Sequence, residues 1–181
     1  MPNTIKCWAF FFKQLVMTFI FQSQIPSDFK SHPILISGDD SKALPKVEFL
    51  VSDSDVVYEL RYEYKTSPFN DIRIFGDRLA VGYHEHFYLF DKDQNTLLLK
   101  LQMQFYFGSI YFNDSYIYVA DACGIFCISQ GGVVLWHTDN LAIDGVVIND
   151  FIDSKIFGKG EYDPPGGWEP FVLDIKTGFK L

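Results

Sequence analysis

Cysteine is scarce in this chain of 181 residues. Cys7, Cys123 and Cys127 are odd in number, and their spacing matches no metal-binding pair. Cys123 and Cys127 flank a predicted turn at Gly124, so we interpret them as small apolar residues at strand ends. Nothing in this set requires an oxidising compartment, and the sequence favours a cytoplasmic location.

Positive charge is also in short supply. Between Leu101 and Ser154 there is no Lys or Arg, and the whole chain has a net charge of −8 with a pI of about 4.8. The acidic residues of this stretch are Asp114, Asp121, Asp139, Asp144, Asp150 and Asp153. Such a surface repels phosphate backbones, so we expect no nucleic-acid partner. It suits a basic protein partner, although an acidic face kept for solubility is the commoner case.

Catalytic motifs are missing. We find no nucleophile elbow, no glycine loop for phosphate and no His-Glu-x-x-His pair. His137, Thr138 and Asp139 cluster locally, but no Ser or Cys is placed beside them, so turn chemistry explains them. Glu161 and Asp163 could serve as acid and base in glycoside cleavage, yet any acidic loop offers such a pair. The sequence therefore predicts a protein that is not an enzyme and has no cofactor.

The chain lacks an uninterrupted membrane span. Residues 5–21 are almost wholly apolar, but Lys6, Lys13 and Gln14 interrupt them. A signal peptide would need a clearer cationic start and a small-residue cleavage site. The pattern fits two strands turning at Lys13 and Gln14 or a helical face, and a membrane-associated segment is the third alternative. We expect no membrane partner, so the rest of the chain should cover this segment.

Aromatic residues are abundant, at 18% of the chain, and they favour strands. A short pattern recurs at intervals of 37 and 39 residues: Phe75-Gly76-Asp77, Phe112-Asn113-Asp114 and Phe151-Ile152-Asp153. Around each copy we predict short strands separated by turn residues. Four strands in about 38 residues are typical of a propeller blade. The sequence therefore predicts an all-β fold of about four propeller-like blades.

The predicted blades form one domain over residues 1–181. Residues 34–64 make a degenerate repeat with strands near 34–36, 47–51 and 56–64, and with a poor second strand around Ala43 and Leu44. Residues 70–103, 107–138 and 145–181 make clear repeats. The last repeat has room for only a stub of its outer strand, so we expect the apolar segment 1–25 to complete or cover the last blade. An open array of blades is the alternative.

Two motifs resemble those of quinoprotein-type (PQQ-like) β-propellers. Leu173-Asp174-Ile175-Lys176-Thr177-Gly178 is similar to their turn between strands, and Val134-Leu135-Trp136 resembles the start of the following strand. The resemblance covers residues 70–181, and the Trp-Asp dipeptide of a related repeat class is absent. It implies a propeller fold. It does not carry quinone chemistry across, because four repeats cannot form the funnel that holds the cofactor in those enzymes.

The fourth repeat contains an insertion between its second and third strands, at residues 160–170. Its prolines restrict the backbone, so we expect an ordered loop. The loop presents Tyr162 and Trp168 beside Glu161, Asp163 and Glu169, a suitable anchor for a basic or sugar-like partner. The structural alternative is that Trp168 plugs the end of the core and the loop caps a blade edge.

Loops between second and third strands share one face of a propeller. His84-Glu85-His86 and Asp121-Ala122-Cys123 should therefore join the inserted loop at a common rim. His84 and His86 with a neighbouring carboxylate could hold a divalent metal, but two exposed imidazoles are commoner, and we predict no metal site.

Together these features predict a non-enzymatic protein-binding domain with an acidic and aromatic surface and a basic protein partner. One concrete form is a bacterial immunity protein that neutralises a basic toxin. The expected binding residues are Glu161, Tyr162, Asp163, Trp168, Glu169, Asp121, His84 and His86. The alternative is a small-ligand or carbohydrate site at the rim, with or without hydrolytic activity, and a structural domain of a larger assembly is a third interpretation.

Overall fold

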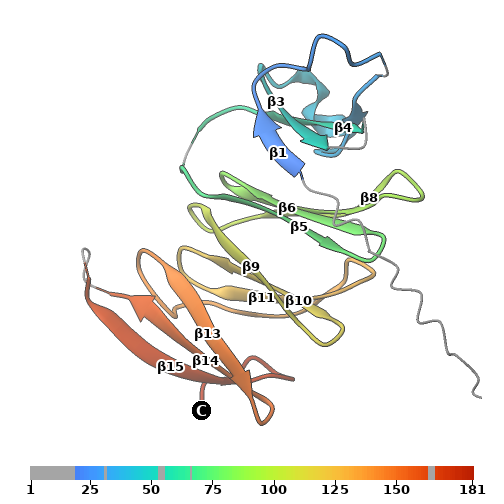
Figure 1. Cartoon of the computed structure of the whole chain (residues 1–181). Helices are drawn as coiled ribbons and strands as arrows, with labels where there is room; N and C mark the ends of the chain where they lie inside the picture. The colour runs from blue at the N-terminus through green and yellow to red at the C-terminus, as the bar shows by residue number, and fades with distance from the viewer. Residues whose placement is uncertain (1–18, 31, 53–55, 66, 163–165) are drawn as a thin grey trace, which may run out of the picture.

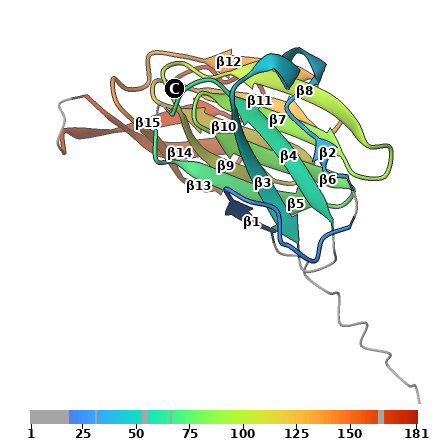
Figure 2. The ribbon, with the colours of Figure 1, turned by 90° about the horizontal axis from the view of Figure 1, so that it is seen from above.

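The computed structural model describes residues 19–30, 32–52, 56–65, 67–162 and 166–181, and these residues are folded into four β-sheets. Figure 1 shows the sheets stacked in chain order, with the first and the last at opposite ends, and Figure 2 shows the stack from above. The predicted all-β fold with propeller-like blades is confirmed, and the blades form an open stack. In this part of the chain, no helix has the length and apolarity to cross a membrane.

The second and third sheets are antiparallel meanders in which neighbouring strands follow one another along the chain. The second consists of β5 (Asn70–Phe75), β6 (Arg78–Tyr83), β7 (His86–Asp91) and β8 (Thr96–Gln102). The third consists of β9 (Phe107–Asn113), β10 (Tyr116–Asp121), β11 (Ile125–Ser129) and β12 (Val134–Thr138). The middle strands of both sheets are almost wholly buried because a further sheet covers each of their faces.

The recurring Phe-x-Asp pattern marks the hairpin between the first two strands of a sheet. Gly76, Asp114 and Asp153 each begin the two-residue turn there, with φ of 55°, 51° and 49°. Tight hairpins need positive φ at this position, which Gly and Asp tolerate better than other residues.

The fourth sheet has three named strands: β13 (Val146–Ile152), β14 (Lys155–Glu161) and β15 (Trp168–Asp174). After β15 the chain turns around the Asp174 carboxylate, whose Oδ1 accepts bonds from the backbone N–H of Lys176 at 3.0 Å and of Thr177 at 2.9 Å. A bridge between Leu173 and Lys180 then begins a fourth position in the sheet. This position corresponds to the predicted stub of an outer strand.

The first sheet departs from the repeat. It comprises β1 (Phe19–Gln22), β2 (Ile34–Leu35), β3 (Lys46–Ser52) and β4 (Val57–Tyr62), in the order β1-β3-β4-β2, with β2 parallel to β4. Where a second strand was expected near Ala43, the chain forms a 3-10 helix, η1 (Asp39–Ala43).

The expectation that the apolar N-terminal segment covers the last blade is wrong for its described part. Strand β1 pairs with β3 in the first sheet, at the other end of the stack. The rings of Phe19 and Phe21 pack against Tyr58 and Tyr83, with centroids 5.5 and 5.0 Å apart. Residues 1–18, which carry the rest of that prediction, lie outside the described residues.

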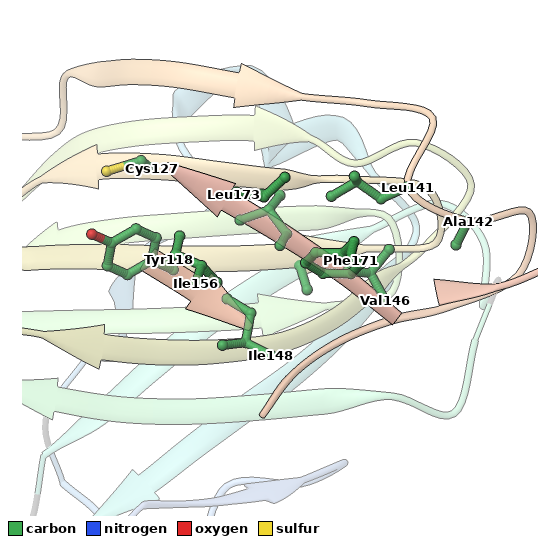
Figure 3. Packing of buried hydrophobic residues seen from close by; sticks show 11 residues of the cluster. Tyr118, Cys127, Leu141, Ala142, Val146, Ile148, Ile156, Phe171 and Leu173 are labelled. Atoms are coloured by element: carbon green, nitrogen blue, oxygen red, sulfur yellow. The ribbon is translucent and has the colours of Figure 1, made fainter. Parts of the chain in front are cut away.

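Three hydrophobic clusters fill the spaces between successive sheets. Figure 3 shows the cluster between the third and fourth sheets, which includes Tyr118, Cys127, Ile156 and Phe171. Close approach of the sheets requires glycine at two places. A side chain at Gly82 would collide with the ring of Phe107, and one at Gly160 would collide with the backbone of the facing connector.

Candidate binding surface

One edge of the stack gathers the turns after β6, β10 and β14 together with the connectors between sheets. The backbone N–H of Phe107 donates to the backbone carbonyl of His84 at 2.6 Å, and that of Gly145 donates to the backbone carbonyl of Ala122 at 2.8 Å. Each connector is therefore bound to the turn of the sheet before it. We call this edge the rim and define it as residues 63–65, 67–69, 84–85, 103–106, 122–124, 139–145, 161–162 and 166–168.

Asp121 is placed at the base of the rim but is fully buried. Its Oδ1 accepts bonds from the backbone N–H of Cys123 at 2.9 Å and of Gly124 at 2.7 Å, and its Oδ2 accepts one from Gln104 at 2.9 Å. The carboxylate therefore holds the turn after β10 and ties it to the connector between β8 and β9. Asp121, which was predicted to bind a partner, therefore stabilises the fold by accepting three backbone hydrogen bonds.

His84 is also buried, with its backbone at a φ of 55°. Its Nδ1 lies 2.8 Å from the carbonyl oxygen of Ser67, while its Nε2 has no partner among the described residues. Burial lowers its pKa, so the ring is neutral at pH 7. It lines an open cavity of about 540 Å³ with Glu48 and Tyr83, whose side chains are hydrogen-bonded to each other at 3.0 Å.

His86 is only partly buried, and its ring stacks on Tyr88 with centroids 5.7 Å apart. Burial lowers its pKa, and the nearby charge of Lys100 lowers it further. Across the described ranges, no three His, Cys, Asp or Glu side chains are grouped as metal ligands would be.

The inserted loop of the fourth sheet is anchored by two of the predicted residues. Glu161 Oε1 accepts a bond from the backbone N–H of Gly166 at 2.6 Å, and the Tyr162 hydroxyl donates to the Asn140 carbonyl at 3.2 Å. Trp168 and Glu169 are exposed at the start of β15. Asp163 lies outside the described residues.

The side chains around Gly145 show how the rim is built between the third and fourth sheets. A Cβ at Gly145 would lie 3.4 Å from Trp168 Cη2 and 3.9 Å from both Glu161 Oε2 and the Tyr106 hydroxyl. Tyr106 also donates to the carbonyl of Asp144 at 2.7 Å and to its carboxylate at 3.0 Å. The backbone at Gly145 is thus surrounded by four side chains: Tyr106 and Asp144 from the connectors before β9 and β13, and Glu161 and Trp168 from the two ends of the inserted loop.

Electrostatics at this point favour cations. Burial raises the pKa of Tyr106, and the hydrogen bond to Asp144 and the charges of Asp144 and Glu161 raise it further. The described rim and the adjacent Glu169 carry more acidic residues than the single ammonium of Lys65. These acidic residues are Glu63, Glu85, Asp139, Asp144, Glu161 and Glu169. The described rim is thus a negative surface.

Aromatic side chains continue the surface toward the second sheet. Phe69 is 50% exposed and packs against Tyr106 with ring centroids 5.5 Å apart. Phe105 is 68% exposed and has a φ of 66°, and the N–H of Tyr106 donates to the carbonyl of Gln104 across it at 2.9 Å. Phe105 is therefore the central residue of a γ-turn with positive φ, which is a rare and strained conformation.

The repeat pattern did not predict Phe69, Phe105, Tyr106 and Asp144 as site residues, because it aligns the turns between second and third strands and not the connectors between sheets. The signal that could have found them is positional. Phe105-Tyr106 and Asp144-Gly145 both immediately precede the first strand of a sheet, in connectors that the repeat brings to the same edge.

Comparison with known proteins supports the fold alone. No protein-family model matches the chain, and no curated protein does. The computationally designed protein Ika8 matches with a TM-score of 0.51 at 15% identity, over 75% of this chain and 45% of its own. The designed protein Ika4 matches with a TM-score of 0.48 at 15% identity, over 61% of this chain and 68% of its own.

The WD40 domain of Pan2 from Neurospora crassa gives a TM-score of 0.46 at 11% identity, over 75% of this chain and 45% of its own. The chain thus spans somewhat less than half the length of Ika8 and of the Pan2 domain. What the likeness defines is an all-β, propeller-like repeat protein.

Proposed function

We propose that this protein is a non-enzymatic binding module whose rim takes a basic protein partner. The observation that carries the proposal is the conformation of Phe105. A left-handed backbone costs a non-glycine residue about 1–2 kcal/mol, and here it turns a large ring outward, where 68% of the residue is exposed. The fold gains little from that ring, so the strain is explained by a contact that Phe105 makes with another molecule.

The residues around Phe105 fit the anatomy of a protein interface. Phe69, Tyr106 and Trp168 supply aromatic area, which is enriched at the centre of such interfaces. Asp144 and Glu161 supply negative charge that would steer a basic partner to this face.

Two more specific proposals concern the biological role of the protein and its repeat class. A cytoplasmic bacterial immunity protein that neutralises a basic toxin would use this face, because acidic and aromatic groups would cover a cationic active site. We also assign residues 70–181 to the quinoprotein-type repeat class. That assignment is supported by the Asp174 turn and by Trp136, whose Nε1 donates to the Ile175 carbonyl at 3.2 Å.

The first experiment is native mass spectrometry of the untagged protein purified gently from its host. We expect a stoichiometric basic protein that is retained at low salt and released at high salt. A bare monomer under both conditions would contradict the proposal and would favour the small-ligand alternative at the rim.

Variants then locate the contact. Phe105→Asn should lower partner affinity at least about tenfold, because exposed aromatic anchors dominate such interfaces. It should leave the thermal midpoint unchanged or raised, because Asn tolerates positive φ. Asp144→Lys should weaken binding and reduce its salt dependence. Asp77→Lys is the matched control, since Asp77 lies in the hairpin turn at the opposite edge. If Asp144→Lys and Asp77→Lys lowered the affinity for the partner equally, the partner would not bind at the rim.

A further inference from the structure

A second feature lies at the edge of the stack opposite the rim. There, between the third and fourth sheets, is a cavity of about 440 Å³. Its mouth is formed by the hairpin turns at Asp114 and Asp153 and by Lys176 in the turn after β15, and its walls come from the sheets themselves. The volume falls in the range of small-molecule sites, and none of the rim residues lines it.

The walls of the cavity are aromatic. The ring of Tyr118 has its centroid 4.9 Å from that of Phe151 and 5.9 Å from that of Trp136, and all three residues line the space. Such a set of rings offers flat apolar faces with negative potential, which attract both apolar bodies and cations. The indole N–H of Trp136 is already used, because it donates to the Ile175 carbonyl.

The Tyr118 hydroxyl is a polar group of the cavity wall, beside the Cys127 thiol. Tyr118 is fully buried, and its hydroxyl has no nitrogen or oxygen partner among the described residues; its polar neighbour is the Cys127 thiol, which bonds only weakly. Figure 3 shows this hydroxyl at one end of the cluster, pointing away from Phe171 and Val146. Burial raises the pKa of Tyr118, and the neighbouring Cys127 thiol raises it further, so the hydroxyl keeps its proton and can donate or accept. A buried hydroxyl without a partner costs about 1–3 kcal/mol, which a bound polar group would recover.

The mouth of the cavity carries more negative than positive charge. Asp114 and Asp153 sit in their turns at positive φ, and neither carboxylate makes a hydrogen bond or an ion pair with any part of the chain that is described. The charge of Asp114 reaches the Tyr118 hydroxyl, since it contributes to the raised pKa of that group. Lys176 is the ammonium at the same mouth, and its backbone N–H is held by Asp174.

We propose that this cavity binds a small organic cation: a protonated amine carried on an aromatic or aliphatic body. The body lies between Phe151 and Trp136, and the ammonium faces Asp114 and Asp153 at the mouth. The Tyr118 hydroxyl accepts from, or donates to, the ligand inside the cavity. The site is separate from the rim and does not depend on the protein partner proposed there.

Calorimetric titration of the full chain with three probes of similar size tests the charge preference. The probes are 2-phenylethylamine, 2-phenylethanol and 3-phenylpropionate, which differ in charge on a common phenyl body. We expect the amine to bind at least about tenfold more tightly than the alcohol, and the carboxylate to bind most weakly. Equal binding of amine and alcohol would overturn the proposal, as would no binding of the amine at about 10 mM.

Three variants locate the site. Asp153→Asn should lower amine affinity about threefold or more and narrow the gap between amine and alcohol. Tyr118→Phe should lower amine affinity about fivefold without lowering the thermal midpoint, because among the described residues the hydroxyl it removes faces only the weakly bonding Cys127 thiol. Tyr111→Phe is the matched control: its hydroxyl accepts from the Ile148 N–H at 3.2 Å in the same interface, but Tyr111 does not line the cavity. Amine binding that is unchanged by both Asp153→Asn and Tyr118→Phe would refute the assignment.

Discussion

The sharpest stability prediction concerns Asp121, which the sequence suggested as a binding residue and the structure buries. Replacing it with Ala removes the acceptor of three backbone N–H groups. Those of Cys123 and Gly124 belong to fully or nearly buried residues, whereas Gln104 is exposed and water can take over its bond. Each buried N–H left without an acceptor costs about 1–3 kcal/mol, so we expect Asp121→Ala, which leaves two of them, to lower the free energy of unfolding by about 2–6 kcal/mol.

Asp121→Asn refines the same argument. The variant keeps a carbonyl oxygen for the two turn N–H groups, but its buried amide N–H₂ faces the Gln104 N–H without an acceptor, so we expect a loss of about 1–2 kcal/mol. Asp144→Ala is the control, because Asp144 is an exposed acid of a neighbouring connector; its change should stay within about 0.5 kcal/mol.

Urea unfolding at pH 7 measures all three variants. With a slope of about 2 kcal/mol per molar urea, a loss of 3 kcal/mol moves the midpoint down by about 1.5 M. The order of stability should be wild type and Asp144→Ala together, then Asp121→Asn, then Asp121→Ala. An Asp121→Ala midpoint indistinguishable from that of wild type would show that the carboxylate does not hold the turn.

Three further outcomes follow from the same structure. Gly160→Ala places a methyl group against the backbone of the facing connector and should cost about 1–3 kcal/mol in urea unfolding, whereas Gly131→Ala, whose nearest neighbour would be 3.8 Å away, should change little. Burial lowers the pKa of His86, so below about pH 6.5 the unfolded chain binds protons more readily and the free energy of unfolding should fall; His86→Gln should flatten that slope. Hydrogen bonds from Thr177 lower the pKa of Asp174, so its contribution is present above the usual carboxyl range and is lost as the pH falls below about 4, and Asp174→Asn should show less acid sensitivity in the same titration.

The second, third and fourth sheets could be read from the sequence because their cues are local. Each hairpin has a residue that tolerates positive φ at a fixed place, such as Gly76 or Asp114, and each strand carries a short β-rich run. The first sheet could not be read in this way. Strand β2 has only two residues and pairs in parallel with β4, from which η1 and β3 separate it along the chain. Its partner is therefore set by tertiary packing.

The candidate surface was predicted in part. The aromatic and acidic composition of the inserted loop placed Trp168 and Glu161 correctly at the rim. Asp121 was predicted to be an exposed binding residue and is buried. The sequence could not decide this, because an Asp in a predicted turn can be a surface acid or an acceptor for turn N–H groups. Phe105 escaped notice because a Phe beside a strand usually belongs to the core, and its backbone strain depends on coordinates.

The open stack also bears on how the protein is made. The second, third and fourth sheets are each built from one continuous run of chain, and each packs against the sheet before it. Such an architecture can assemble sheet by sheet as the polypeptide leaves the ribosome, with every finished sheet serving as the template for the next. When synthesis has just passed β12, the newest surface displays Tyr118 and Cys127 with nothing yet to cover them. The nascent chain then exposes apolar surface to aggregation and to chaperones, until β13 to β15 are translated and cover this surface.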